Sequence, residues 1–310
     1  MEPGGRVVRH DTLESKAFPS LEAAVKTFLG AKPPRVTSAA FGVAGPIVDQ
    51  RCKATNLPWV IDARVLARKL AIKNVRLLND LVALAVGALH VPASKLHVVG
   101  SNGAPRKKGG NIAVIAAGTG LGEAVLVWDD ETGRFVPTAT EGGHADFGAA
   151  DAEQAELLAW LQARHGHVSW ERLVSGMGLG NVYDFLREAK GMPERPENDD
   201  ALRAAADRNA AISQLGAADE SEPAARAVAM FARLYGAEAG NLALKSLASG
   251  GVYVCGNIAQ KMLPVLERGG FRAAFEDKGR LRPLLEAMPM AVVLDSDVGL
   301  KGAKQVAVEL

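Results

Sequence analysis

Short apolar runs bounded by glycine, proline, asparagine or aspartate recur along the chain and alternate with stretches of helical periodicity. The short runs predict buried strands, and the longer periodic stretches predict helices. A strand–helix alternation with short connections is typical of an α/β protein. The predicted strands are 6–13, 37–43, a bent pair in 47–55, 74–78, 112–117, 124–128, a short strand within 249–258, and 290–294. The predicted helices are 20–29, 62–70, 81–89, 152–164, one that begins at Ser169, 224–247 and 299–308, and surface loops around one short helix are expected in 190–223.

The centre of this pattern is the stretch 111–128, in which a glycine turn separates two apolar runs. The first run reads as a buried strand and the second as its antiparallel return. Gly118, Gly120 and Gly122 remove side chains at the turn, which leaves Thr119 and several backbone N–H groups to face an anion. The turn is therefore a candidate phosphate-binding loop.

Two commoner glycine motifs do not fit this turn. A Walker loop needs Lys and Ser or Thr after its glycines, and a dinucleotide fingerprint needs a helix, whereas a strand follows here. An ordinary hairpin whose glycines serve only the turn remains the alternative.

Asp80 follows the predicted strand 74–78 at its carboxyl end, where open α/β sheets place their ligands. It also precedes the predicted helix 81–89, and aspartate is a favoured N-cap. The pattern alone leaves catalysis and capping open for Asp80.

Further polar candidates follow the glycine hairpin. Glu141 and His144 are separated by two glycines, which disfavours a helical metal site and indicates a loop that presents both side chains. Glu171 lies in the first turn after Ser169, where an acidic residue also complements a helix dipole. The turn 56–59 ends in Trp59, which either contacts a ligand or anchors the core.

The bulk composition narrows the class of protein. A chain of 310 residues with 48% hydrophobic and 23% charged residues is long enough for two lobes. A net charge of +1 gives no overall field for nucleic acid or an anionic membrane, so neither partner is expected. The only cysteines, Cys52 and Cys255, form no metal or disulfide motif, and no apolar segment is long enough for a membrane helix. We therefore expect a cytoplasmic protein without a protein-held metal.

Several motifs follow one another along nearly the whole chain. They are Leu78-Asn-Asp-Leu, Ala117-Gly-Thr-Gly-Leu-Gly, Glu141-Gly-Gly-His, Glu171-Arg-Leu-Val-Ser-Gly, Ser249-Gly-Gly-Val-Tyr-Val and Gly269-Gly-Phe-Arg-Ala-Ala-Phe-Glu-Asp-Lys-Gly. In this order they resemble the bacterial glucokinase family, within the actin-like sugar kinase superfamily.

The resemblance implies a two-lobed actin-like (ribonuclease H-like) α/β fold and ATP-dependent phosphorylation of D-glucose. Asp80 would take the proton from the sugar 6-hydroxyl and contact the sugar. Asn79, Glu141, His144 and Glu171 would hold the other hydroxyls, because a carboxylate accepts hydrogen bonds from two vicinal O–H groups.

The same resemblance implies ATP with Mg²⁺ as cofactors and places a phosphate on the glycine hairpin. Asn257 stands where the family tends to have a glycine, so its side chain would crowd the nucleotide or hydrogen-bond to it. The residues expected to bind the nucleotide are Gly118, Thr119, Gly120, Leu121, Gly122, Gly250, Gly251, Gly256 and Asn257.

The expected small lobe spans 1–90 and 294–310, and the expected large lobe spans 91–293, with sugar and ATP in the cleft between them. A homodimer is a further expectation from the family.

One departure from the family concerns the start of the sequence. The family usually opens with a strand, Asp-Ile-Gly-Gly-Thr and another strand, whereas this sequence begins where the third strand is expected, so its small lobe is incomplete at the N-terminus. From residues 1–310 alone we therefore expect little phosphoryl transfer. The alternative function is an N-terminally truncated or degenerate glucokinase-like protein that binds sugar without transferring phosphate.

Overall fold

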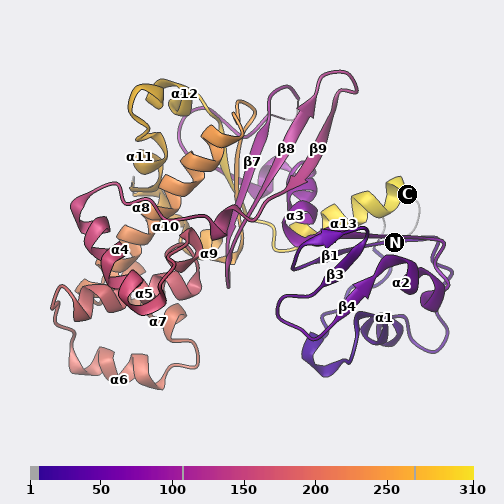
Figure 1. The fold of residues 1–310 in the computed structure, drawn as a ribbon, viewed down its shortest axis with the longest axis horizontal. Helices are drawn as coiled ribbons and strands as arrows, with labels where there is room; N and C mark the ends of the chain where they lie inside the picture. The colour runs from indigo at the N-terminus through magenta and orange to yellow at the C-terminus, as the bar shows by residue number, and fades with distance from the viewer. Residues whose placement is uncertain (1–6, 107, 269) are drawn as a thin grey trace. The chain divides into compact units, whose positions relative to one another are not determined.

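The computed structural model describes residues 7–106, 108–268 and 270–310, and the chain divides into two compact units (Figure 1). Unit 1 consists of residues 1–87 and 298–310, and unit 2 consists of residues 88–297. These boundaries lie a few residues from those of the expected lobes.

Unit 1 combines strands and helices from both ends of the chain. Its elements are η1 (Ser15–Ala17), α1 (Leu21–Leu29), β1 (Ser38–Val43), β2 (Ile47–Val48), β3 (Arg51–Lys53), β4 (Val60–Asp62), α2 (Ala63–Leu70), β5 (Asn74–Asn79), α3 (Asp80–Ala88) and α13 (Val298–Glu309).

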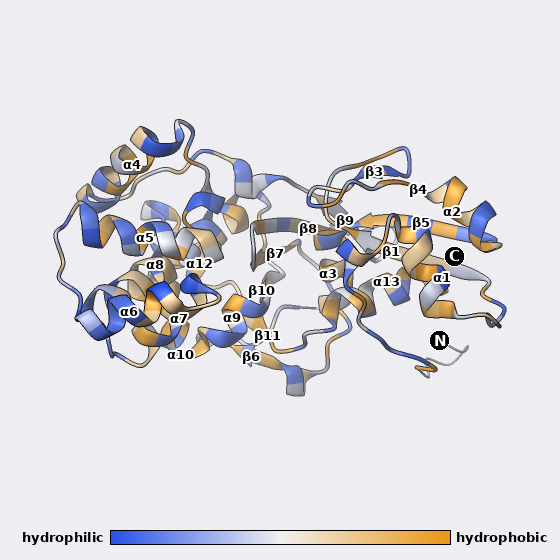
Figure 2. Cartoon of the chain, turned by 90° about the horizontal axis from the view of Figure 1, so that it is seen from below, coloured by the Kyte–Doolittle hydropathy of each residue, from blue (hydrophilic) through white to orange (hydrophobic). Residues whose placement is uncertain are grey.

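The parallel pair β1–β5 forms the centre of unit 1, and β2, β3 and β4 form a separate antiparallel sheet. Helix α2 carries both hydrophobic and hydrophilic residues (Figure 2) and buries Leu66 while Lys69 stays exposed. Trp59 is 6% exposed, and its Nε1 donates to the Phe18 carbonyl at 3.1 Å. Trp59 is therefore a core anchor, as one of its two interpretations predicted.

Helices α3 and α13 approach each other closely at two glycines. A Cβ at Gly87 would overlap the Val298 carbonyl, and a Cβ at Gly302 would overlap the Ala83 carbonyl. Because only glycine permits this approach, the helix that starts at Asp80 packs directly against α13.

Unit 2 contains the remaining elements. They are η2 (Ala93–Lys95), β6 (Leu96–Val98), β7 (Ile112–Ala117), β8 (Leu121–Asp129), β9 (Arg134–Ala139), η3 (Gly142–His144), α4 (Ala152–His165), η4 (Trp170–Arg172), α5 (Gly176–Glu188), α6 (Pro196–Ala204), α7 (Arg208–Ala217), α8 (Glu222–Lys245), β10 (Gly251–Cys255), α9 (Asn257–Lys261), α10 (Leu263–Glu267), α11 (Gly270–Glu276), η5 (Gly279–Leu281), α12 (Arg282–Glu286) and β11 (Met290–Val293).

The sheet of unit 2 has the strand order β6-β11-β10-β7-β8-β9. Strands β7, β10 and β11 are parallel and almost wholly buried, whereas β8 and β9 run antiparallel as a meander. Buried parallel strands explain why their sequences are continuous apolar runs rather than alternating ones. Helix α8 crosses this sheet and buries most of its length in the main hydrophobic core.

Three expectations about secondary structure are wrong. The helix expected to begin at Ser169 does not form there: only the 3-10 turn η4 follows, the Ser169 side chain caps nothing, and α5 begins at Gly176 with Ser175 as its cap.

Residues 7–13 form no strand. Val7 and Val8 are more than half exposed, and none of the described strands pairs with this segment; Arg6 lies outside the described residues. The polar stretch 190–223 contains two helices, α6 and α7, rather than one. Pro196 starts the first helix, and the Asp207 side chain caps the second.

Lys107 and Gly269, which begins the last of the sequence motifs, also lie outside the described residues. Among the helices that the structure describes, none has both the length and the apolar character needed to span a bilayer.

Candidate active site

The glycine hairpin joins β7 to β8 at one end of the unit 2 sheet. The Gly118 N–H donates to the Gly120 carbonyl at 2.8 Å, which closes the turn. The Gly118 carbonyl accepts a hydrogen bond of 2.8 Å from the N–H of Gly176, the first residue of α5. A Cβ at Gly118 would meet no atom within 4 Å, so the backbone faces open space. An open backbone beside a helix N-terminus suits a phosphate group.

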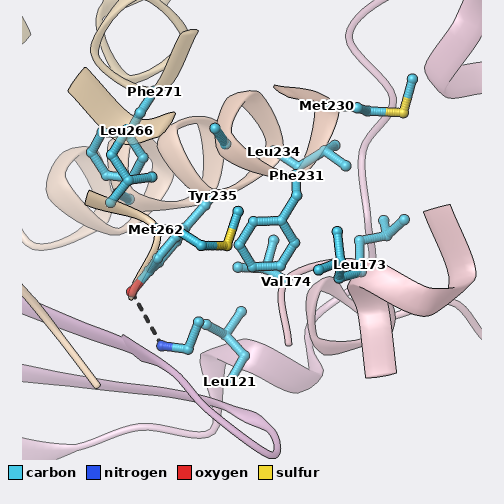
Figure 3. Close-up of a cluster of buried hydrophobic side chains, with 14 of the residues drawn as sticks. Leu121, Leu173, Val174, Met230, Phe231, Leu234, Tyr235, Met262, Leu266 and Phe271 are labelled. Carbon is cyan, nitrogen blue, oxygen red and sulfur yellow. Dashed lines mark hydrogen bonds between the residues drawn. The ribbon is translucent and has the colours of Figure 1, made fainter. Parts of the chain in front are cut away.

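The buried side chain of Tyr235 fixes the strand ends that carry the hairpin. Its hydroxyl accepts a hydrogen bond of 3.1 Å from the Ala117 N–H and lies 3.3 Å from the Cys255 carbonyl, to which it can donate. Figure 3 shows the Tyr235 ring between Phe231 and Phe271, and both contacts are edge-to-face. Burial raises the pKa of Tyr235, so the hydroxyl stays protonated and keeps both bonds.

A cavity of 480 Å³ lies beside the hairpin within unit 2. This volume falls in the range of small-molecule and cofactor sites. Its walls come from the hairpin, α5, α7 and α9, and include Gly118, Thr119, Gly176, Met177, Asp207, Asn209, Ala210, Ser213, Asn257, Ile258 and Lys261.

Glu171 lies on the other side of the hairpin. Its Oε2 accepts a hydrogen bond of 3.0 Å from the Leu121 N–H, and a Cβ at Gly120 would overlap the same carboxylate. The Glu171 side chain is 25% exposed, so it is only partly buried beside the hairpin. Gly120 is therefore required for the approach of Glu171, in addition to serving the turn.

The turn η3 carries Glu141 and His144 and packs on β8 through two glycines. A Cβ at Gly143 would overlap the Leu121 carbonyl, and a Cβ at Gly142 would overlap the Glu123 carboxyl group. The predicted loop is thus a single 3-10 turn, closed by a hydrogen bond of 3.0 Å from the His144 N–H to the Glu141 carbonyl.

The structure brings His144 close to Glu171, and Glu141 directly precedes the turn that carries His144; these three residues form the candidate polar cluster. His144 Nδ1 lies 4.0 Å from Glu171 Oε1, and the Trp170 N–H donates to the Ala145 carbonyl at 3.1 Å. Glu141 and His144 are exposed, so both side chains are available to a polar ligand.

In unit 1, Asn79 and Asp80 mark the junction of β5 and α3. Asn79 Oδ1 accepts hydrogen bonds from the N–H groups of Leu81 and Val82, at 2.9 and 3.3 Å. Asp80 is the first residue of α3, and its Oδ1 lies 3.0 Å from the Leu81 N–H. Asn79 therefore provides the N-cap that the sequence pattern left open for Asp80.

Asp80 has a further neighbour in Cys52. Burial raises the pKa of the Cys52 thiol, and the negative charge of Asp80 raises it further. Cys52 and Cys255 are both buried free cysteines.

Two of the glycines predicted to bind the nucleotide lie at the start of β10. Gly250 directly precedes β10 and Gly251 begins it, whereas Gly256 and Asn257 follow its opposite end. A Cβ at Gly250 would meet the Gly110 carbonyl at 2.6 Å, and one at Gly251 would meet the Pro289 carbonyl at 2.6 Å. These two glycines are explained by close packing of the backbone and do not line the cavity.

The other predicted nucleotide residues divide into two groups. Gly118, Thr119 and Asn257 line the cavity, and Gly256, at φ +90°, turns the chain from β10 into α9 against the Ala117 carbonyl. Leu121 is buried, and Gly122 lies within β8 opposite Ala116, so both belong to the strand that carries the hairpin.

Sequence reasoning missed the cavity wall made by α7. Asp207, Asn209 and Ser213 belong to the stretch interpreted as surface loops, and no local motif marks them. An acidic residue three positions before Ala210 was a capping signal, and it would have located the start of α7.

No group of three or more His, Cys, Asp and Glu side chains is placed to hold a metal ion in the described part of the chain.

Known proteins resemble this chain in sequence and in fold. A sequence model of the glucokinase family matches residues 2–310. The glucokinase of Synechocystis sp. (strain ATCC 27184 / PCC 6803 / Kazusa) is 40% identical over 314 residues, covering 94% of this chain and 86% of that protein.

Solved structures share the fold. A glucokinase from an Antarctic psychrotroph matches with a TM-score of 0.80 and 29% identity, over 97% of this chain and 89% of that one. A ROK family glucokinase from Streptomyces griseus, solved in complex with glucose and AMPPNP, matches with a TM-score of 0.60 and 21% identity, over 89% of this chain and 83% of that one. At that identity the second likeness concerns the fold alone.

These matches confirm the predicted actin-like sugar kinase fold, and they do not favour the alternative of a sugar-binding protein without transfer activity. The chain belongs to the glucokinase family.

Proposed function

We propose that this chain, an ATP-dependent hexose kinase by family, transfers the γ-phosphoryl group of ATP to the 6-hydroxyl of D-glucose. One observation carries the proposal: the hairpin that lines the cavity also holds Glu171, through the hydrogen bond from Leu121. A phosphate-binding loop and a hydroxyl-binding carboxylate are thereby fixed to each other, and phosphoryl transfer depends mainly on such positioning.

The nucleotide side of the proposal uses the 480 Å³ cavity. Its mixed lining of methionine, isoleucine and polar side chains suits an adenosine group, with the phosphates directed to the open backbone at Gly118 and Thr119. Asn257 lines the same cavity at the start of α9, and we infer that its side chain hydrogen-bonds to the nucleotide.

The sugar side uses the cluster of Glu141, His144 and Glu171, together with Asn79. Carboxylates accept hydrogen bonds from pairs of hydroxyls and so select one sugar stereochemistry. The bond from Leu121 occupies one lone pair of Glu171 Oε2 and leaves Oε1 available for a sugar hydroxyl.

Asp80 is proposed as the general base. As the sugar O6 forms its bond to the γ-phosphorus, the bond from that phosphorus to the bridging oxygen breaks, ADP leaves, and the O6 proton passes to the Asp80 carboxylate. Since Asn79 caps α3, Asp80 is not required for that task.

We propose that Mg²⁺ enters as its complex with ATP. Magnesium is commonly bound by substrate phosphates, water and one or two carboxylates rather than by an all-protein cage. The described residues offer no such cage, so we assign no residue to the metal and derive no step through it.

A homodimer and a cytoplasmic location complete the proposal. Both rest on the family, and two buried unpaired cysteines suit a reducing compartment. Sedimentation at several protein concentrations would test the dimer.

The direct test is a coupled assay of glucose 6-phosphate formation with Mg·ATP, alongside calorimetric titration of glucose without nucleotide. The sequence alone predicts little phosphoryl transfer, but membership of the glucokinase family leads us to expect both binding and product. Glucose binding without product would favour the sugar-binding alternative, and absence of both would contradict the proposed substrate.

A further inference from the structure

Two buried glutamates lie behind the candidate site and take no part in the proposed chemistry. Glu123 on β8 is 2% exposed, and Glu238 on α8 is fully buried. One oxygen of each, Oε1, has no hydrogen-bond partner among the described residues. Two buried ionised carboxylates would be costly, so a carboxyl pair of this kind retains a proton.

The surroundings assign the proton to Glu123. Lys245 Nζ lies 3.5 Å from Glu238 Oε1, and Asn241 Nδ2 donates to Glu238 Oε2 at 2.7 Å, so Glu238 has partners suited to the ionised form. Burial raises the pKa of Glu123 to about 8, and the charge of Glu238 acts in the same direction. Burial also raises the pKa of Glu238, while Asn241, Lys245 and the hydrogen bond with Glu123 oppose that rise.

Other titratable groups around the pair are few. Lys278 donates to the Ala237 carbonyl at 3.0 Å, and burial lowers its pKa against the opposing charges of Glu238 and Asp277. Burial raises the pKa of the Tyr235 hydroxyl, and the charge of Glu123 acts in the same direction, so this hydroxyl stays protonated. Glu123 is therefore the member of this pair whose carboxyl group loses its proton near neutral pH.

The turn η3 packs on the side chain of Glu123. The carboxyl group of Glu123 occupies the space that a side chain at Gly142 would need. The backbone carbonyl of Glu123 accepts a hydrogen bond of 3.2 Å from Thr140 Oγ1, which in turn accepts one of 3.2 Å from the Gly142 N–H. The turn that presents Glu141 and His144 therefore packs directly on this carboxyl group.

A second cavity reaches Glu123. It has a volume of 410 Å³, and Glu123, Thr140, Gly142 and Lys245 are among its lining residues. It shares no lining residue with the nucleotide cavity, so proton exchange with Glu123 through it would not involve the nucleotide site.

We propose that Glu123 is a positioning residue for the sugar-binding turn 141–144, and that loss of the proton it shares with Glu238 displaces this turn and weakens glucose binding. The inference rests on the proposed sugar-binding role of that turn. Ionisation would place a negative charge beneath Gly142 beside the charge of Glu238, while Lys245 already pairs with Glu238.

The test compares wild type, Glu123→Gln and Glu238→Gln between about pH 6 and pH 9.5. We expect the wild-type KM for glucose to rise about tenfold from pH 7 to pH 9, as a group titrating near the middle of that range dictates. The KM for ATP should change much less. Glu123→Gln keeps the shape of the protonated acid and should remove the rise, whereas Glu238→Gln should move its midpoint to lower pH because it removes the neighbouring charge.

Glu131→Gln, at an exposed position in the turn between β8 and β9, is the matched control and should keep the wild-type profile. An unchanged pH profile in both Glu123→Gln and Glu238→Gln would overturn the inference.

Infrared difference spectroscopy provides a readout that does not depend on activity. The wild type should show the carbonyl stretch of a protonated carboxyl group that disappears at high pH and is missing in Glu123→Gln. A protein that shows this band but phosphorylates no glucose would contradict the proposed function and leave the buried proton established. A wild type without the band would overturn the inference.

Discussion

The Tyr235 hydroxyl accepts a hydrogen bond of 3.1 Å from the backbone N–H of Ala117, the residue directly before the glycine hairpin. The same hydroxyl lies within hydrogen-bonding distance of the Cys255 carbonyl, directly before Gly256. One side chain of α8 thus sets the spacing of the two strand ends from which the hairpin and α9 begin.

Replacing Tyr235 with Phe should leave the buried Ala117 N–H without a partner, at a cost of about 1–3 kcal/mol in the free energy of unfolding. The KM for ATP should rise by about three- to tenfold because the hairpin loses its support. Denaturant unfolding and steady-state kinetics measure the two effects. Tyr253→Phe is a matched control, since the Tyr253 hydroxyl is buried with no hydrogen-bond partner among the described residues. Equal effects from both substitutions would contradict the proposed role of Tyr235.

Replacing Asp80 with Asn should lower kcat by about 10²–10⁴-fold, the range for removal of a general base. Calorimetric glucose binding and the free energy of unfolding should change little, because Asn79 supplies the helix cap. Asn79→Ala is the comparison for stability and should cost about 1 kcal/mol. A loss of kcat below tenfold, together with a large loss of stability, would instead assign Asp80 a structural role.

Replacing Gly142 with Ala should force η3 away from Glu123, because the added methyl group would overlap the carboxyl group. A displaced sugar turn should lower kcat/KM for glucose by about 10–100-fold and leave the KM for ATP nearly unchanged. Gly148→Ala is the matched control, since a Cβ at Gly148 would meet no atom within 4 Å. If glucose and ATP were affected equally, η3 would not be a sugar-specific element.

Filling the cavity should weaken nucleotide binding and leave glucose binding nearly unchanged. Ala210 lines the cavity from α7, and Ala210→Leu adds bulk there without disfavouring the helix. We expect the KM for ATP to rise by about tenfold or more, with little change for glucose. Ala204→Leu, at an exposed position on α6, is the control. A wild-type KM for ATP in Ala210→Leu would place the nucleotide elsewhere.

The stability of the chain should depend on the buried proton. The folded pKa of Glu123, about 8, lies above its ordinary value of 4.5, so the folded state binds the proton more tightly. The resulting stabilisation is complete below about pH 4.5 and decreases by up to about 1.4 kcal/mol per pH unit as the pH rises towards 8. Glu123→Gln should therefore lose less stability than wild type over this interval in denaturant titrations. Parallel curves for the two proteins would contradict a shifted pKa.

The strand and helix pattern was largely predictable because most elements are regular and locally signalled. The helix predicted over 20–29 forms as α1 with the Ser20 side chain as its cap, and the run 112–117 forms a buried strand in its predicted place. The strand predicted over 7–13 does not form, because weak alternation indicates a strand only where a partner strand exists, and the local sequence does not identify a partner.

The sequence indicated the parts of the candidate site that carry local motifs, but not the cavity wall that α7 supplies through the tertiary fold. The hairpin at Gly118 was predicted from its pattern and Glu171 from the family resemblance, but their connection through Leu121 depends on how η4 packs on the hairpin. The two adjacent residues Asn79 and Asp80 both resemble caps, and only backbone geometry shows which one caps α3. Gly250 and Gly251 pack closely against other backbone segments, and the sequence cannot distinguish glycine for backbone packing from glycine for ligand approach.

The close approach of α3 and α13 has a consequence for the order of folding. Unit 1 is built from residues 1–87 and 298–310, and Ser38 Oγ donates to the Ala307 carbonyl at 2.6 Å across 269 positions of sequence. During synthesis, therefore, unit 1 cannot complete its core until α13 has been made, whereas all of unit 2 precedes α13 in the chain. The helix that begins at Asp80 acquires this packing partner only after unit 2 has been synthesised, so the proposed general base gains its fixed position only when α13 docks.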